Sequence, residues 1–492
     1  MSIAWVMVAM GVSVCTGWGL LRALWPRDSA YAVGKSGLLR IPLAIGLGWA
    51  VGAAHYCVWR VVYPEFGWLY RLMDCLVIPA AAWWAGRMAR SGSWVPPRAH
   101  SPLQPHSPIH RGYVGALVGL TLGVGIAAVC ISAAQAWREP LGAWDGWAIW
   151  NLKARFLYRG GPHWTAMFSK DIWFSHPDYP LLLPASIARL WSYLGHENTL
   201  VPQLTAVAAT GLAALLLFGV LAWLRGVEQA CFGTLLLVSS KVFLYYGGAQ
   251  VADVPLSFFL LGAIIALVAA QRSQQGVRAL FALSGVLAGC GAMVKNEGLV
   301  ICVVLLAACM VRRGLRRNAL MLVMGMAPAL SLMAVQKTLF AGESYLVADQ
   351  SSFQAVVQKL VDPSRHQTIA WALLDHNVGF YPWRPLAACP LAIPLPNHPG
   401  MVLLLLLTFV CGIWGGGRDR LAVAAAAVTL LLTVGTYYVV LLIMPYDLAT
   451  LVESWPRLQL HIWPSLILVL FLMTRGLGES EQACPASRSL AR

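Results

Sequence analysis

Long apolar blocks separated by short polar segments dominate the hydrophobic pattern of this chain. Most blocks are roughly 15–25 residues long, which is enough for a helix to cross a hydrocarbon core of about 30 Å. Irregular backbone cannot face lipid, so these blocks are predicted to be helices. The pattern therefore predicts an all-α, polytopic transmembrane helix bundle with about 13 spans. The predicted spans are 3–24, 41–63, 72–84, 113–136, 200–224, 230–246, 254–270, 280–294, 299–311, 319–340, 401–414, 421–444 and 458–474.

Composition and charge support this class and suggest an orientation. Hydrophobic residues make up 59% of the 492 residues and charged residues only 11%, whereas soluble domains carry about 25% charged residues. The net charge is +15, and Lys and Arg gather in alternate short loops, beginning with Arg27, Lys35 and Arg40 after the first span. The positive-inside rule then places the N-terminus outside and the C-terminus in the cytoplasm, and it argues against a cleaved signal peptide. The basic residues form no aromatic-interleaved face, so nucleic-acid binding is not expected.

Most acidic residues fall on the opposite, non-cytoplasmic side, including Asp145, Asp178, Asp253 and Glu297. Charged groups near membrane depth usually serve a function, so we expect any chemistry on that side. The 11 cysteines form neither a CxxC motif nor a Cys/His cluster. They predict packing residues rather than a disulfide framework or a metal site.

The order of loops suggests a modular organisation. Residues 1–88 form a three-span unit, and 89–112 form a cytoplasmic linker rich in Pro and Ser, which resists regular structure. Residues 113–474 form the larger membrane module, with long outer loops at 137–199 and 341–400, and 475–492 form a cytoplasmic tail. Within the loops, 144–159 and 181–194 are predicted as surface helices, the first with its aromatic side in the headgroups, and 350–374 as an amphipathic segment.

Four outer features combine residues that can carry chemistry. They are Asp145 in A-W-D-G-W-A-I-W, Asp253 in A-Q-V-A-D-V-P-L, the turn M-V-K-N-E-G with Lys295 and Glu297, and Arg457 in E-S-W-P-R-L-Q-L-H. The predicted topology places all four at about the same membrane depth.

These motifs, together with H-P-D-Y-P-L-L-L-P at 176–184, resemble those of the GT-C class of polytopic glycosyltransferases. The group includes protein O-mannosyltransferases and aminoarabinose transferases, which use sugars linked to polyprenyl phosphate. The resemblance covers roughly 113–474. The mannosyltransferases carry an adjacent Asp-Glu pair where this chain has Trp144-Asp145-Gly146. That departure leaves the sugar unassigned and gives no basis for a metal cofactor.

The resemblance implies transfer of a sugar from polyprenyl phosphate to an acceptor hydroxyl on the non-cytoplasmic face of a bacterial inner or plasma membrane, with inversion. The acceptor is a glycan, a lipid or a protein. Asp145 is the predicted general base, since a hydroxyl needs a base within hydrogen-bond reach. Lys295 and Arg457 are the predicted donor-phosphate ligands, because developing negative charge needs fixed cations. The predicted supporting or substrate-binding residues are Asp253, Glu297, Asp178, Tyr179 and His176.

Each residue also has a structural interpretation. Asp145 and Asp253 are placed to cap helices, Lys295 and Glu297 to pair with each other or snorkel, and Arg457 to anchor in headgroups. Asp178 and Tyr179 lie between prolines and suit a turn.

Three other functions stay open at this point. A polymerase or ligase of lipid-linked glycans shares the donor chemistry. A transporter of lipid-linked sugars would need internal repeats with polar groups at the midplane, and the sequence shows neither. The third is a structural subunit.

Overall fold

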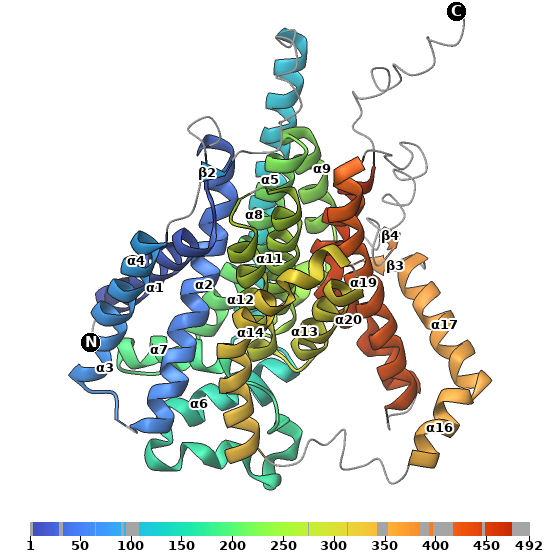
Figure 1. Cartoon of the computed structure of the whole chain (residues 1–492). Coiled ribbons are helices and arrows are strands. Elements are labelled where there is room, and N and C mark those ends of the chain that lie inside the picture. The colour runs from blue at the N-terminus through green and yellow to red at the C-terminus, as the bar shows by residue number, and fades with distance from the viewer. Residues whose placement is uncertain are drawn as a thin grey trace, which may run out of the picture.

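The computed structural model places most of the chain in one helical assembly (Figure 1). The residues it describes are 3–28, 33–63, 65–89, 93–94, 108–273, 275–311, 313–341, 353–378, 380–383, 393–396, 417–444 and 448–474.

Nine of the described helices are long and apolar enough to cross a membrane. They coincide with predicted spans, which confirms the multi-pass all-α class. Large apolar side chains are exposed along several of them, such as Ile126 and Leu320. The nine are α1 (Ile3–Leu24), α2 (Val33–Val62), α5 (Pro108–Arg138), α8 (Leu200–Leu224), α11 (Asp253–Arg272), α12 (Val277–Val294), α14 (Arg313–Leu339), α19 (Gly417–Ile443) and α20 (Leu448–Met473).

The predicted count of about 13 spans is not confirmed. The block 230–246 is broken into α9 (Val227–Val238) and α10 (Lys241–Gly248), which meet at 68°. The block 299–311 lies in α13 (Glu297–Val311), whose 15 residues give a length of about 22 Å. The block 72–84 lies across α3 (Trp68–Leu72), the π-turn η2 (Met73–Val77) and α4 (Ile78–Met88). The block 401–414 lies outside the described residues.

The helix α11 forms the centre of the bundle. Its hydrophobic window is entirely buried, and it packs against α8, α12, α19 and α20. A helix that is apolar on all sides is stable in a protein core or in lipid, and here neighbouring helices rather than lipid surround it. Its first residue is Asp253, so the position of α11 places one carboxylate at the end of the most buried helix.

The helix α7 (Leu182–Leu194) connects the N-terminal helices to the rest of the bundle. It packs against α1, α2 and α6, and its Arg189 donates to the buried carboxylate of Asp74 in η2 at 3.0 and 2.7 Å. Tyr193 donates to the same oxygen at 2.7 Å. The prediction of a surface helix at 181–194 is therefore wrong, because an apolar helix with a charge partner at Asp74 is buried more favourably than exposed.

The predicted helix at 144–159 is present as the π-turn η3 (Gly146–Trp150) and α6 (Asn151–Arg159). Trp144 and Trp147 are exposed, but Trp150 and Leu157 are fully buried. The expectation that the whole aromatic side lies in headgroups is thus wrong, since Trp150 stacks on Tyr179 with ring centroids 5.5 Å apart.

The remaining elements are short. After α6 follow the 3₁₀ segments η4 (Gly161–Phe168) and η5 (Lys170–Ser175). The predicted amphipathic segment contains α16 (Phe353–Val361) and α17 (Pro363–Val378), which lie beside α19 and α20 (Figure 1). Two strand pairs complete the described residues: β1 (Arg27–Asp28) with β2 (Ser93–Trp94), parallel, and β3 (Phe380–Trp383) with β4 (Ile393–Pro396), antiparallel.

Candidate functional site

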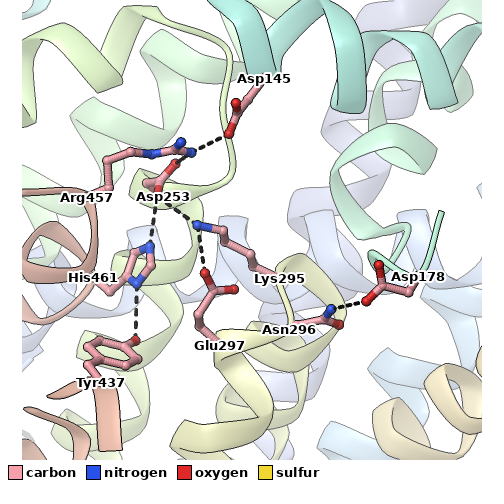
Figure 2. A network of polar contacts seen from close by, with 9 residues as sticks. All are labelled: Asp145, Asp178, Asp253, Lys295, Asn296, Glu297, Tyr437, Arg457 and His461. Carbon is pink, nitrogen blue, oxygen red and sulfur yellow. Dashed lines mark hydrogen bonds and ion pairs between the residues drawn. The ribbon is translucent and has the colours of Figure 1, made fainter. Parts of the chain in front are cut away.

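A chain of polar contacts gathers at the start of α11 and is centred on Asp253 (Figure 2). Nη2 of Arg457 lies 2.6 Å from Oδ2 of Asp145 and 2.9 Å from Oδ2 of Asp253. The other oxygen of Asp253, Oδ1, accepts from Nζ of Lys295 at 3.1 Å. Asp145, Asp253, Lys295 and Arg457 come from four separate segments, and the structure brings all four side chains together.

Lys295 also pairs with Glu297, whose Oε1 lies 3.0 Å from Nζ. The ammonium is almost completely buried, and burial by itself disfavours the charged form. The carboxylates of Asp253 and Glu297 outweigh burial and raise the pKa of Lys295 above its ordinary value. Lys295 is therefore a fixed positive charge within the site.

His461 and Tyr437 extend the chain on the far side of Asp253, and sequence reasoning missed both. Nε2 of His461 lies 2.9 Å from Oδ1 of Asp253, and Nδ1 lies 3.1 Å from the hydroxyl of Tyr437. A carboxylate only accepts, so Nε2 carries the proton and the Tyr437 hydroxyl donates to Nδ1. His461 lies four residues after Arg457 on α20, which places both on one helix face. That spacing was the available signal.

The turn between α12 and α13 carries Lys295 between two closely packed helices. Lys295 is extended, at φ −155° and ψ 151°, which ends α12 and turns the side chain toward Asp253. A Cβ on Gly298 would lie 2.2 Å from the carbonyl oxygen of Gly291. Only glycine allows the helices to approach this closely, so Gly298 fixes the position of the turn.

The loop that carries Asp145 is bound to the segment before α11. A Cβ on Gly146 would lie 2.8 Å from the oxygen of Ala249, and the amide of Ala143 donates to that same oxygen at 3.1 Å. Gln250, with a left-handed φ of 61°, donates to the oxygen of Glu139 at 3.0 Å. Several contacts thus hold the loop against this segment, and they also keep Gln250 in its strained backbone conformation. Together they place Asp145 beside Asp253.

Asp178 forms the other end of the site. Its Oδ2 accepts from Nδ2 of Asn296 at 2.7 Å (Figure 2) and lies 3.9 Å from Nζ of Lys337 on α14. Lys337 also donates to the backbone oxygen of Asp178 at 2.8 Å. Asn296 thus connects the predicted Asp178 to the Lys295 turn. Neither Asn296 nor Lys337 was singled out from the sequence.

Tyr179 and His176 line this end rather than the centre of the network. Tyr179 stacks between the rings of Trp150 and His176, at 5.5 and 4.7 Å. Burial lowers the pKa of His176 and raises that of Tyr179 well above its ordinary value. Both side chains are therefore neutral at physiological pH, and neither acts as a fixed charge.

Lys153 on α6 supports the turn that contains His176 and Tyr179. It is fully buried and donates to the backbone oxygens of His176 and Tyr179, at 2.5 and 3.3 Å. Burial lowers the pKa of its ammonium to about 7. Burial disfavours the ammonium, whereas its hydrogen bonds to carbonyl oxygens and the nearby carboxylate of Asp178 favour it.

The observed contacts agree with some of the structural interpretations of the predicted residues and disagree with others. Asp145 and Asp253 stand at helix starts, yet neither side chain makes a capping hydrogen bond to its helix within the described residues. Both face Arg457 instead. Lys295 and Glu297 do pair with each other, and Arg457 faces two carboxylates rather than headgroups.

Three polar atoms of the network are buried without a hydrogen-bond partner among the described residues: Oδ1 of Asn296, Oε2 of Glu297 and Nε of Arg457. Such atoms are contact points for a polar ligand. Over the same part of the chain, no group of three or more His, Cys, Asp and Glu residues is placed to hold a metal ion. The arrangement can therefore offer hydrogen bonds and fixed charges to a sugar phosphate.

Comparison with known proteins agrees with this chemistry. A family model described as dolichyl-phosphate-mannose-protein mannosyltransferase matches residues 124–344, which is less than half of the chain and includes Asp145, Asp178, Asp253 and Lys295. No curated protein and no solved structure gives a significant match. Residues 124–344 are therefore similar to this family of GT-C glycosyltransferases, and nine of the described helices are long and apolar enough to cross a membrane.

Proposed function

We propose that this glycosyltransferase moves a sugar from a polyprenyl-phosphate donor to an acceptor hydroxyl, with Asp145 as the general base. The observation that carries the proposal is the direct contact between Asp145 and the Arg457–Asp253–Lys295 network. It joins a carboxylate to two fixed cations at one end of the central helix. The family's donor class supports the substrate.

The reaction is a displacement at the anomeric carbon. The acceptor oxygen forms the new bond to that carbon while its proton moves to Asp145. The bond between the carbon and the phosphate oxygen breaks, and its electron pair leaves with the lipid phosphate. Attack opposite the leaving group inverts the anomeric configuration. A base in hydrogen-bond reach contributes about 10²–10⁴ in rate.

The network couples the two ends of this step. Before reaction, Arg457 is shared between the carboxylates of Asp145 and Asp253. Once Asp145 has taken the acceptor proton it is neutral, so the charge of Arg457 becomes available to the departing phosphate. Fixed charges of this kind stabilise the transition state without reorganising solvent. Lys295 contributes a second positive charge, while Asp253 and Glu297 hold it in place.

The non-cytoplasmic side is the proposed location of the reaction. The support is the distribution of Lys and Arg, which gather in the loops at the opposite ends of the predicted spans. The acceptor is a glycan, a lipid or a protein that presents its hydroxyl at that surface.

The test uses purified protein in lipid nanodiscs with a panel of polyprenyl-phosphate sugars, mannose included, and extracts of surface glycan as acceptor. Asp145→Asn should lower transfer about 10²–10⁴-fold while donor binding persists. The matched control is Asp171→Asn, which removes an exposed carboxylate from the same loop and should leave the rate unchanged. Full activity of Asp145→Asn would rule out the proposed base, and a product with retained anomeric configuration would rule out direct displacement.

A further inference from the structure

The guanidinium of Arg457 lies over an aromatic ring. Its Cζ is 5.4 Å from the centroid of the Tyr246 ring, which is within the distance at which the ring face attracts a cation. Within the described residues, both hydrogen bonds of Arg457 are donated by Nη2, to Asp145 and Asp253. Two bonds that converge on one nitrogen leave the rest of the group able to pivot about it. The Tyr246 ring is a second point of contact, so it limits this rotation.

Tyr246 lies on α10, the second half of the broken span. The axes of α9 and α10 meet at 68°, and the break falls at Ser239 and Ser240. Ser240 caps the new helix, because its hydroxyl oxygen accepts from the amide of Phe243 at 3.3 Å. Such an oxygen satisfies an amide that the start of a helix leaves without a partner. The chain therefore ends one helix here and begins another in a new direction, and the redirected helix carries Tyr246.

Close packing fixes α10 at the residues next to this tyrosine. A Cβ on Gly248 would collide with the backbone oxygen of Ser132 on α5, and one on Gly247 would lie 2.6 Å from the hydroxyl oxygen of Thr210 on α8. The hydroxyl of Ser132 donates to the oxygen of Leu244 at 3.0 Å, and that of Thr210 donates to the oxygen of Gly247 at 3.1 Å. Because both neighbouring helices hold its backbone, α10 presents the tyrosine ring from a fixed position.

The end of α10 also holds the loop that carries the proposed base. The amide of Ala143 donates to the oxygen of Ala249 at 3.1 Å, and Ala249 follows directly after α10. Asp145 comes two residues later in the same loop. One short helix therefore contacts both members of the ion pair: Arg457 through the Tyr246 ring, and Asp145 through its loop.

We propose that Tyr246 is a positioning residue for Arg457 and that the break between α9 and α10 serves to place its ring there. This inference rests on the proposed function. Before reaction, two carboxylates hold the guanidinium. Once Asp145 has accepted the proton, only Asp253 attracts the guanidinium as an anion, whereas the attraction of the ring does not depend on that proton. The ring thus keeps the cation in place when the departing phosphate needs its charge.

Initial rates of transfer by the full-length protein in nanodiscs test the proposal. Tyr246→Leu removes the ring and should lower kcat roughly twofold to thirtyfold, the range expected for a cation–π contact. The donor KM should stay nearly constant, because the contact acts in the transition state. Tyr246→Phe keeps the ring and should restore most of the rate. The matched control is Tyr245→Leu, which removes a ring that is 41% exposed and lies over no cation within the described residues, and it should leave kcat unchanged.

A second pair of variants separates positioning of Arg457 from support of the fold. In an Arg457→Gln background, Tyr246→Leu should have almost no further effect on kcat, because the ring then has no cation to hold. A ring that merely stabilised α10 would lower kcat by the same factor in both backgrounds. Thermal unfolding of each variant in nanodiscs should give the midpoint of its parent protein.

A native kcat in Tyr246→Leu would overturn the proposal, as would an equal loss in the Arg457→Gln background. A loss in Tyr246→Phe as large as that in Tyr246→Leu would also overturn it, since the hydroxyl rather than the ring would then be responsible. These outcomes differ from failure of the proposed function, which would appear as transfer that survives in Asp145→Asn.

Discussion

The guanidinium of Arg457 contacts the carboxylate of Asp145 at 2.6 Å, although 312 positions separate them along the chain. The contact joins the predicted base to the predicted cation. One nitrogen, Nη2, serves both Asp145 and Asp253, so the position of the guanidinium is set by two acids from different loops.

Replacing Arg457 by lysine tests this shared contact. An ammonium on a shorter reach cannot keep both carboxylates within 3 Å, so we expect Arg457→Lys to lower transfer about 10²-fold or more. Initial rates at saturating donor give the measurement. Because Asp145 and Arg457 belong to one network, the double variant with Asp145→Asn should lose less than the product of the two single effects. A rate for Arg457→Lys within about twofold of the native protein would contradict the coupling.

His461 acts as a positioning residue for Asp253. His461→Leu removes the Nε2 donor and also leaves the Tyr437 hydroxyl without its acceptor. Such losses cost about 1.5–3 kcal/mol for the bond to the charged group, so kcat should fall about tenfold or more with donor KM little changed. His461→Gln keeps an N–H donor at a similar position and should restore part of the rate. Equal losses in both variants would argue for a purely structural role.

The Asp74–Arg189 pair joins the N-terminal helices to α7, and both side chains are at most 6% exposed. Arg189→Met would leave the carboxylate buried with fewer donors, which typically costs about 3–5 kcal/mol. Thermal unfolding in nanodiscs measures this loss. The matched control, Arg159→Met, breaks a pair with Glu197 in which the arginine is 66% exposed, and should cost no more than about 1 kcal/mol. The double variant Asp74→Leu/Arg189→Met should be more stable than Arg189→Met, and the opposite order would contradict this account.

Lys153 should make stability depend on pH. Its pKa is about 7 in the folded protein because of burial and about 10.4 when unfolded. Between these values the unfolded state binds more protons, so native stability rises with pH and falls as pH drops toward 7. Lys153→Met removes this dependence. The difference in unfolding free energy between the native protein and Lys153→Met should therefore change across pH 7–10, by up to about 1.4 kcal/mol per pH unit. A difference that stays constant over this range would show that Lys153 does not titrate there.

Some helices follow from the hydrophobic pattern alone, whereas the position of others depends on contacts between distant segments. The span at 200–224 coincides with α8 because apolar length alone determines such a helix. The segment 181–194 was expected at the surface, and only the contact of Arg189 with Asp74, 115 positions away, explains its burial. Likewise, nothing near Lys337 in the sequence indicates that its ammonium meets Asp178.

The sequence by itself determined the membrane class, the placement of most helices and the four motifs that converge at the site, because hydrophobic length and residue type are local properties. The charge asymmetry of the loops further predicted one membrane depth for Asp145, Asp253, Lys295 and Arg457, which stays a prediction. Only the tertiary structure decided which groups touch: that Arg457 is shared by two acids, that His461 and Tyr437 extend the network, and that Lys337 meets Asp178. Contacts over 2.5–4 Å depend on how helices pack against one another, and packing is a property of the whole bundle that no single segment encodes.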